Sequence, residues 1–182
     1  IDSVSLPSLR DKITVIAQDP QLFEGTLREN VDVLGRYSDE EVKKALDMAN
    51  LSNLYDSTEG LDKEIKSGGE NLSAGERQMI CIARALLKHN KVVLIDEATS
   101  NIDMNNEEIF LKTVKERFKD CTVLTVAHRL NTIINSDKII VMSEGKFVEV
   151  GDPKELLQRE DSIFGKMWNE AKRMKNKTVE RD

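Results

Sequence analysis

Two adjacent carboxylates, Asp96 and Glu97, follow a short apolar run that begins at Val92. Such a run is typical of a buried strand in a parallel sheet, and it brings its last residues to the carboxyl edge, where open α/β folds bind ligands. There, one acid suits a Mg²⁺ site and the other suits the acceptance of a proton from water. The simpler interpretation is two solvated carboxylates at the end of a strand.

A second candidate lies upstream, where Ser73 and Glu76 form the pattern of a capping box before a helical run. Apolar residues at spacings of three and four follow, so a well-capped amphipathic helix explains the segment without any function. Gly75 weakens that explanation, because a glycine costs a helix about 1 kcal/mol relative to alanine. A phosphate that approaches the free N–H groups of the first turn would require such a residue. Together with the acid pair, this segment indicates nucleotide hydrolysis.

Two more polar residues follow predicted strands. Gln18 comes directly after residues 13–17, and His128 comes soon after residues 122–126. A lone histidine is more often structural than catalytic. However, the carboxyl ends of parallel strands meet at one edge of a sheet, so we expect Gln18, Asp96 and His128 to lie near one another.

The order of the predicted elements is that of an α/β protein. Strands are predicted at 13–17, 92–95, 122–126 and 138–142, a helical pattern at about 26–89, and further helical stretches at 107–118 and near 132. This alternation predicts a parallel sheet with covering helices. After it we expect a hairpin turn at Glu144 and Gly145, a helix that starts at Asp152 and Pro153, and an amphipathic helix over 162–177.

Composition limits the class of protein. The 182 residues are 39% hydrophobic, enough for one core or for one core and a small lobe. The net charge of -6 does not indicate a nucleic-acid or anionic-membrane surface. No apolar run approaches the roughly 18 residues that span a bilayer, and no signal peptide is visible, so we expect this segment to be soluble. Cys81 and Cys121 fit no metal motif and are expected to be free, buried thiols.

The chain contains no G-x-x-x-x-G-K-[ST] loop, the motif that cradles nucleotide phosphates. It also begins at Ile1, without an initiator methionine and within an apparent strand. We therefore expect it to be a piece of a longer protein.

Five stretches resemble, in order, the motifs of the nucleotide-binding domain of ABC transporters. The resemblance is closest to the second (C-terminal) ATPase domain of the multidrug-resistance-associated (subfamily C) exporters, and it runs almost from end to end. The stretches are the Q-loop and its continuation at 18–30, the signature loop at 72–76, the Walker B strand at 92–97, the D-loop at 100–103 and the switch-histidine loop at 126–129.

The resemblance implies a P-loop NTPase-like (ABC ATPase) α/β fold: a parallel sheet core, incomplete here, with an inserted α-helical subdomain. Residues 1–25 would begin the core and carry the Q-loop, 26–89 would form the helical subdomain that ends in the signature helix, 90–160 would form the RecA-like core, and 161–182 would form the C-terminal helix and tail. The Walker A loop and its strand would lie upstream of Ile1. That strand would lie between the strands at 122–126 and 138–142, so its absence would leave a slot in the sheet.

The resemblance also implies roles for the residues at the sheet edge. Glu97 would act as the general base, and His128 would contact the γ-phosphate of ATP. Asp96 would support Mg²⁺. Gln18 would sense both the metal and the attacking water.

The face that carries the signature loop, here called the signature face, would contact a different nucleotide. In the family's head-to-tail dimer, Ser73, Gly75 and Glu76 would close over ATP held by the partner domain, and Asp103 would lie at the same contact. Ala74 and Glu76 depart from the usual signature, which has Gly and Gln. The charge of Glu76 near a polyphosphate would cost affinity unless this side chain points away or caps the helix.

The function implied is that of the C-terminal portion of an ABC exporter's ATPase domain, which binds and hydrolyses ATP with Mg²⁺ and couples hydrolysis to transmembrane transport. Its partners would be a second nucleotide-binding domain and the transmembrane domains with their coupling helices, with no nucleic acid. It would lie at the cytoplasmic face of a membrane, as part of an integral membrane protein, and would be inactive alone.

Two alternatives remain. The chain would be either a noncatalytic module that completes a partner domain's ATP site, or a soluble ABC ATPase that does not transport. Glu97 and His128 favour the exporter, and the missing phosphate loop favours the noncatalytic module. The lack of coiled-coil heptads argues against the soluble ATPase.

Overall fold

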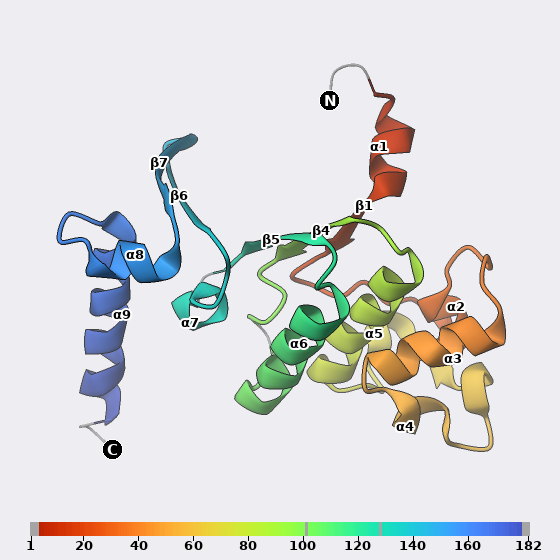
Figure 1. The fold of residues 1–182 in the computed structure, drawn as a ribbon. Helices are drawn as coiled ribbons and strands as arrows, with labels where there is room; N and C mark the ends of the chain where they lie inside the picture. Colours follow the sequence, from red (N-terminus) through yellow and green to blue (C-terminus); the bar gives the residue numbers. More distant parts are fainter. Residues whose placement is uncertain (1–3, 101, 128, 180–182) are drawn as a thin grey trace. The chain divides into compact units, whose positions relative to one another are not determined.

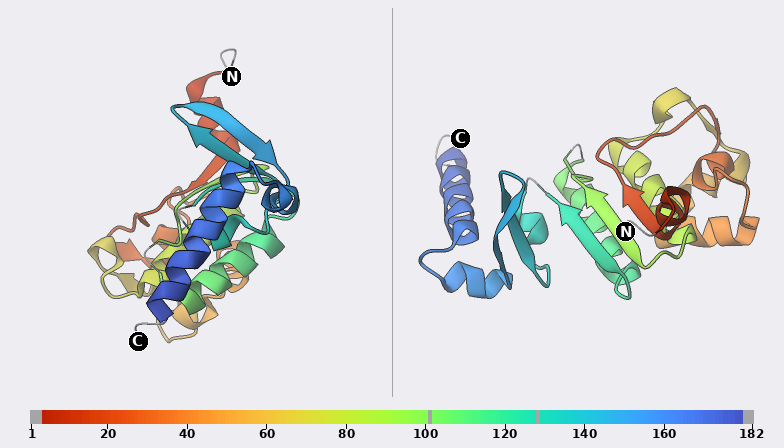
Figure 2. Two further views of the ribbon diagram at one scale, coloured as in Figure 1. Left: turned by 90° about the vertical axis from the view of Figure 1, so that its left-hand side faces the viewer. Right: turned by 90° about the horizontal axis from the view of Figure 1, so that it is seen from above.

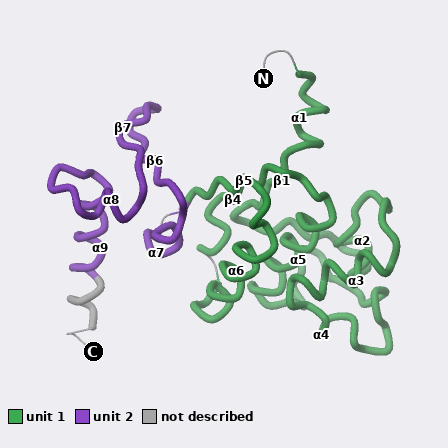
Figure 3. The backbone as a smooth tube through the Cα atoms, in the orientation of Figure 1, with its two compact units in different colours: residues 1–126 green, residues 127–182 purple. Residues whose placement is uncertain are grey.

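The fold is that of a computed structural model, which describes residues 4–100, 102–127 and 129–179, with side chains as far as Met174. The chain divides into two compact units, residues 1–126 and residues 127–182 (Figure 3). Each unit has its own core. Among the described residues, no helix is both long enough and apolar enough to cross a membrane.

The first unit is built on a parallel sheet of three strands, in the order β1-β4-β5 (Figure 1). They are β1 (Ile13–Ile16), β4 (Val92–Asp96) and β5 (Thr122–Val126). Ile16 pairs with Ile95, and Asp96 pairs with Val126, so the three strands end close together. The parallel pairing predicted for these strands is confirmed.

Two long helices, α5 (Ala74–Leu87) and α6 (Met104–Arg117), cover one face of this sheet, as two views show (Figures 1 and 2). Alternate strand residues are buried against them, among them Ile16, Val93 and Ile95. This alternation is the two-residue period expected of a strand with one buried face.

The segment between β1 and α5 carries short helices and one small antiparallel pair. The elements are α2 (Leu27–Val31), α3 (Asp39–Met48), α4 (Ser52–Tyr55), the 3-10 turns η1 (Gly60–Asp62) and η2 (Ser67–Gly69), and the pair β2 (Gly25–Thr26) with β3 (Glu64–Ile65). The expectation of a helical pattern throughout 26–89 is therefore wrong at this pair and at these turns. Gly60, Gly68 and Gly69 have positive φ angles of 57°, 65° and 71°, a backbone that a helix does not accept.

Helix starts agree closely with the sequence patterns. The predicted capping box of Ser73 with Glu76 is present with reciprocal hydrogen bonds, and a second box joins Ser38 to Glu41 at the start of α3. A third box joins Thr26 to Glu29 at the start of α2. A further helix, α1 (Leu6–Lys12), precedes β1 and was not predicted.

The second unit contains α7 (Leu130–Ile133), the hairpin β6 (Ile139–Ser143) and β7 (Lys146–Gly151), α8 (Pro153–Gln158) and α9 (Ile163–Val179). The turn at Glu144 and Gly145 and the Asp152 cap of α8 are confirmed. The core contains Phe164 of α9, Leu156 of α8 and Ile139 of β6.

Strand β6 corrects one prediction. The sequence order placed it in the parallel sheet, but among the described residues it pairs only with β7, in antiparallel register. The tight turn brings β7 back onto β6 and satisfies one edge of that strand locally. The slot expected beside β5 stays a prediction.

Candidate functional site

The carboxyl edge of the three-stranded sheet brings together most of the residues predicted to act on ATP. Asp96 is the last residue of β4 and is exposed. Gln18 is exposed two residues beyond the end of β1, the strand beside β4. Glu97 follows Asp96, and its backbone N–H donates to the Val126 carbonyl at 2.9 Å. His128, the fourth residue predicted here, lies outside the described residues.

Glu97 has an unusual backbone. Its φ angle is 46°, the left-handed region that residues other than glycine rarely adopt. The turn is fixed on both sides, because the Glu97 carbonyl also accepts a hydrogen bond of 3.0 Å from the Ser100 N–H. Strain of this kind costs about 1–3 kcal/mol and is concentrated at functional sites. It marks Glu97 as the best candidate for chemistry at this edge.

The donor set at the edge fits Mg²⁺. This ion prefers oxygen ligands and is usually held by one or two carboxylates together with waters and phosphate oxygens. The exposed Asp96 carboxylate and the exposed Gln18 amide offer such oxygens at neighbouring strand ends.

The start of α5 explains the unusual residue of the signature stretch. The Ser73 backbone N–H donates to Glu76 Oε2 at 2.8 Å, and the Ser73 hydroxyl donates to the same oxygen at 2.8 Å. In return, the Glu76 N–H donates to Ser73 Oγ at 3.2 Å. The carboxylate of Glu76 is therefore folded back onto the helix start, where it is favourable to the helix dipole.

Gly75 has a neighbour that sequence reasoning missed. A Cβ at this position would come within 2.7 Å of Asn106 Cγ. A phosphate was the expected reason for the glycine, and the structure supplies another: the Asn106 side chain of α6 lies against the backbone of α5. The asparagine carries no motif of its own, so only the fold reveals this contact.

Asp103 is the N-cap of α6 and holds Asn106 in place. It accepts from the backbone N–H groups of Asn105 and Asn106, and Asn106 Nδ2 donates to its other oxygen at 2.6 Å. The backbone N–H and the amide of Asn106 lower the pKa of the Asp103 carboxyl. The starts of α5 and α6 thus form one surface that carries Ser73, Glu76 and Asp103, whereas Gly75 is buried beneath the Asn106 side chain.

A small pocket joins three segments of the first unit that carry or adjoin the motif stretches. It is lined by Asp19, Pro20, Ala74, Arg77, Gln78, Ala98 and Ile102. These residues come from the segment after β1, from the first turns of α5 and from the segment after β4. Gln78 is a polar residue on the buried side of α5, and sequence reasoning assigned it no role.

Comparison with known proteins decides the family. Residues 1–100, more than half of the chain, match the family model described as "ABC transporter". The chain belongs to the ABC transporter family. The resemblance deduced from the five motif stretches is thereby confirmed.

Its relatives include members of sub-family C. It is 47% identical over 159 residues to human ATP-binding cassette sub-family C member 2, a match that covers 87% of this chain and 10% of that protein. It is 44% identical over 173 residues to the metal resistance protein YCF1 of Saccharomyces cerevisiae, covering 94% of this chain and 11% of that protein. The chain thus spans only about a tenth of the length of these relatives.

The fold is also that of a solved exporter. A bacterial Atm1-family ABC exporter with ATP bound superposes with a TM-score of 0.83 at 34% sequence identity, over 94% of this chain and 30% of that chain. The predicted α/β class with a P-loop NTPase-like parallel core is confirmed. The four-part division of the chain and the assignment to the second ATPase domain stay predictions.

Proposed function

We propose that this chain is part of the ATP-binding and ATP-hydrolysing domain of an ABC exporter, in which hydrolysis drives transmembrane transport. The observation that carries the proposal is the strained Glu97 beside Asp96 and Gln18 at one sheet edge. Its relatives of sub-family C and the exporter with ATP bound support the same conclusion.

Hydrolysis at this edge would begin with a water molecule placed in line with the γ-phosphate of ATP. Glu97 would accept a proton from that water, and Gln18 would orient it through its side-chain amide. Asp96 and Gln18 would hold Mg²⁺, which when bound offsets negative charge on the phosphates. The γ-phosphate contact proposed for His128 belongs to the same step.

The surface formed by the starts of α5 and α6 would contact ATP held by a second nucleotide-binding domain. Both helices are 14 residues long, and their first turns present N–H groups and the positive ends of two helix dipoles. The hydrogen bond from Ser73 to Glu76 and the contact of Asn106 with Gly75 hold these turns together. A head-to-tail dimer would use this face as its half of a shared site.

The transmembrane domains would contact the first unit through their coupling helices, and this chain would then lie at the cytoplasmic face of a membrane. Apolar side chains near α2 support such a contact. Phe23, Val33 and Leu34 are exposed there, although residues of this type are normally buried.

The test uses the full-length protein that contains this chain, purified in lipid nanodiscs. Glu97→Gln should lower Mg²⁺-ATPase activity by about 100-fold or more while ATP still binds, because only the proton acceptor is lost. Glu116→Gln, at an exposed position on α6, is the matched control. An unchanged rate in Glu97→Gln would contradict the proposal.

The noncatalytic alternative rests on the missing phosphate loop and predicts a different result. A module that only completes a partner's site would tolerate Glu97→Gln but would lose the partner's activity with Ser73→Ala. The same two variants therefore separate the two functions.

A further inference from the structure

A buried amide on α5 reaches the segment that carries Gln18. The Gln78 side chain is 1% exposed, and its Nε2 donates to the Ala17 carbonyl at 3.1 Å. Burying an amide among apolar neighbours is costly unless it is hydrogen-bonded. The bond therefore ties α5 to the residue directly before Gln18.

A second side chain of α5, Arg84, holds the far end of the same segment. Its Nη1 donates to the Gln21 carbonyl at 2.6 Å, and its Nε donates to the Asn30 carbonyl. Its Nη2 donates to Asn30 Oδ1 at 3.3 Å. Burial lowers the pKa of Arg84, but an arginine stays charged, and its planar fork of donors suits several carbonyls at once.

Asn30, which Arg84 binds, in turn binds the middle of the segment. It is fully buried, and its Oδ1 accepts from the Phe23 N–H at 3.1 Å. Its Nδ2 donates to the carbonyls of Phe23, at 2.9 Å, and Thr26, at 3.1 Å. The segment from Ala17 to Asn30 is therefore held to α5 at both ends.

We propose that Gln78 and Arg84 are positioning residues that fix Gln18 to the helix that begins at Ser73. The two groups that would act on opposite nucleotides, Gln18 and the Ser73 turn, then move as one body when the signature face closes on a partner. The pocket supports this reading, because Gln78 lines it together with Asp19 of the Gln18 segment and Ala74 of the Ser73 turn. The inference rests on the proposed function and assigns new residues to it.

The kinetic consequence follows from what these residues touch. Gln78 holds the carbonyl of Ala17, directly before Gln18, and Arg84 holds the carbonyls of Gln21 and Asn30 beyond it. Loosening the tie displaces Gln18 and leaves other nucleotide contacts intact. The loss should therefore appear in kcat and not in the KM for ATP.

The first measurement is the ATPase activity of the full-length protein. Gln78→Leu and Arg84→Met should each lower kcat by about tenfold to 100-fold, with the KM for ATP changed by about twofold or less. Arg84→Lys keeps the charge and a donor and should recover part of the rate. An equal change of kcat and KM, or no change of kcat, would overturn the positioning role.

The second measurement is hydrogen exchange at single-residue resolution on the same proteins. The Phe23 amide donates to Asn30, so in Arg84→Met its exchange should be at least about tenfold faster. The matched control is Arg77→Met: this arginine of the same helix donates instead to the carbonyls of Gly69, at 3.3 Å, and Leu72, at 2.6 Å. It should leave exchange of the Phe23 amide unchanged.

The two measurements separate the inference from the proposed function. Faster exchange at Phe23 supports the anchoring whether or not the wild type hydrolyses ATP, whereas a wild type without ATPase activity would overturn the proposed function alone. Unchanged exchange at Phe23 would overturn the anchoring. Exchange in β4 checks folding, and if Arg84→Met does not fold, Arg84→Lys and the nearly isosteric Gln78→Leu carry the test.

Discussion

At the scale of single residues, Glu76 controls what the Ser73 hydroxyl can do. A hydroxyl has one hydrogen to donate, and here it is donated to the Glu76 carboxylate at 2.8 Å. Ser73 cannot donate to a phosphate oxygen at the same moment. The carboxylate and a bound phosphate therefore compete for one hydrogen atom, and they also repel each other.

Glu76→Gln should consequently preserve or tighten ATP binding at the closed signature face. The amide oxygen can still cap the helix, while the negative charge is removed. We would measure ATP affinity in the full-length protein with Glu97→Gln in the background, so that no nucleotide is hydrolysed. A large loss of ATPase activity in Glu76→Gln alone would contradict this reading.

Gly75 permits a second prediction. Gly75→Ala should push Asn106 away and break its 2.6 Å bond to Asp103, so exchange of the first amides of α6 should become faster. In an Asn106→Ala background the same change should be tolerated, because no side chain remains to be displaced. Hydrogen exchange of the wild type, the two single variants and the double variant measures the coupling free energy between the two positions. We expect this energy to be about 1 kcal/mol. Equal effects in both backgrounds would exclude it.

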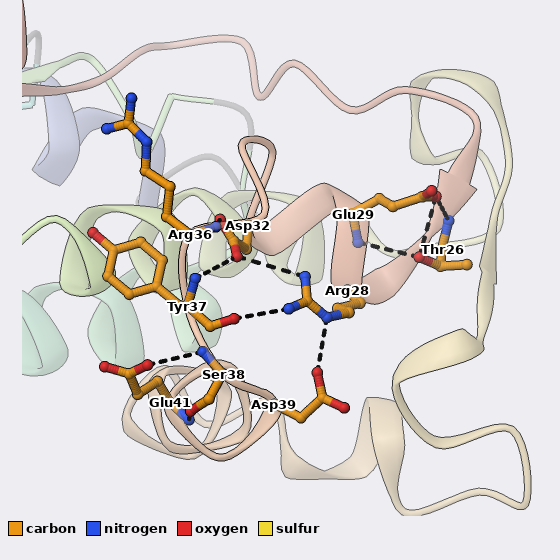
Figure 4. Close-up of polar contacts among 9 residues, drawn as sticks. All are labelled: Thr26, Arg28, Glu29, Asp32, Arg36, Tyr37, Ser38, Asp39 and Glu41. Atoms are coloured by element: carbon orange, nitrogen blue, oxygen red, sulfur yellow. Dashed lines mark hydrogen bonds and ion pairs between the residues drawn. The ribbon is translucent and has the colours of Figure 1, made fainter.

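At the scale of elements, the link between α2 and α3 depends on one arginine (Figure 4). Arg28 donates to Asp39 at 2.8 Å, to the Tyr37 carbonyl at 2.8 Å and to Asp32 at 3.5 Å. Asp32 is 5% exposed and also accepts from the N–H groups of Arg36 and Tyr37. Arg28 and Asp32 therefore hold the loop between the two helices closed.

This link should fail in acid. Burial by itself raises the pKa of Asp32, but the hydrogen bonds from Tyr37 and Arg36 and the charge of Arg28 outweigh it and lower the pKa below its usual value. A lowered pKa means that the stabilisation is complete above the unfolded value of about 3.9 and is lost as the pH falls through the folded value.

Asp32→Asn should open the loop even at neutral pH, at a cost of about 1–3 kcal/mol, because it weakens charge-assisted bonds to buried groups. Exchange of the Arg36 and Tyr37 amides measures the opening. Asp62→Asn, at an exposed position in η1, is the control. Protection that is unchanged in Asp32→Asn would show that the backbone alone closes the loop.

The second unit has a comparable contact, in which Glu149 of β7 caps α9. Its carboxylate accepts from the Phe164 N–H at 2.8 Å and from the Ser162 hydroxyl at 3.1 Å. The Phe164 N–H, and next to it the Ser162 hydroxyl, lower the pKa of Glu149 despite the opposing effect of burial. The cap is thus present above the unfolded pKa of about 4.3 and is lost below it.

Glu149→Gln should therefore fray the first turn of α9 at neutral pH, and lowering the pH should do the same in the wild type. Exchange of the Phe164 amide reports both effects. Glu144→Gln, in the exposed turn of the same hairpin, should leave that amide protected. If Glu149→Gln keeps the protection, Ser162 is a sufficient cap by itself, through its hydroxyl oxygen that accepts from the Gly165 N–H at 2.9 Å.

At the scale of the whole molecule, the first unit leaves one sheet face open. Val15, Leu124 and Val126 are 61%, 48% and 60% exposed there, although parallel sheets are normally covered on both faces. Among the described residues β5 pairs only with β4, so its other edge has unpaired backbone groups. Uncovered apolar area and an open edge both favour association with other chains.

The isolated chain of 182 residues should therefore be marginally stable and prone to aggregation. It should bind the dye ANS, melt without a sharp transition and give no calorimetric signal with Mg²⁺-ATP, because it lacks a phosphate loop. A version extended upstream by one βα unit should bind the nucleotide. A sharp cooperative melt, or ATP binding by the short chain, would contradict this prediction.

Much of this protein is determined by the sequence alone, because the interactions concerned are local. Capping boxes depend on residues three apart, strands on a two-residue period, and the acid pair on its place directly after a strand. These patterns predicted the site at the end of β4 and the start of α5. His128 was predicted in the same way.

Only the tertiary structure decided the contacts between residues far apart in the chain. Gln78 and Arg84 meet the Gln18 segment, and Asn106 meets Gly75, because α5 packs against β1 on one side and α6 on the other. Likewise, β6 pairs with β7 in an antiparallel hairpin, since strand pairing depends on which edges meet in space. No local sequence pattern encodes such long-range contacts. These contacts hold the candidate site in place.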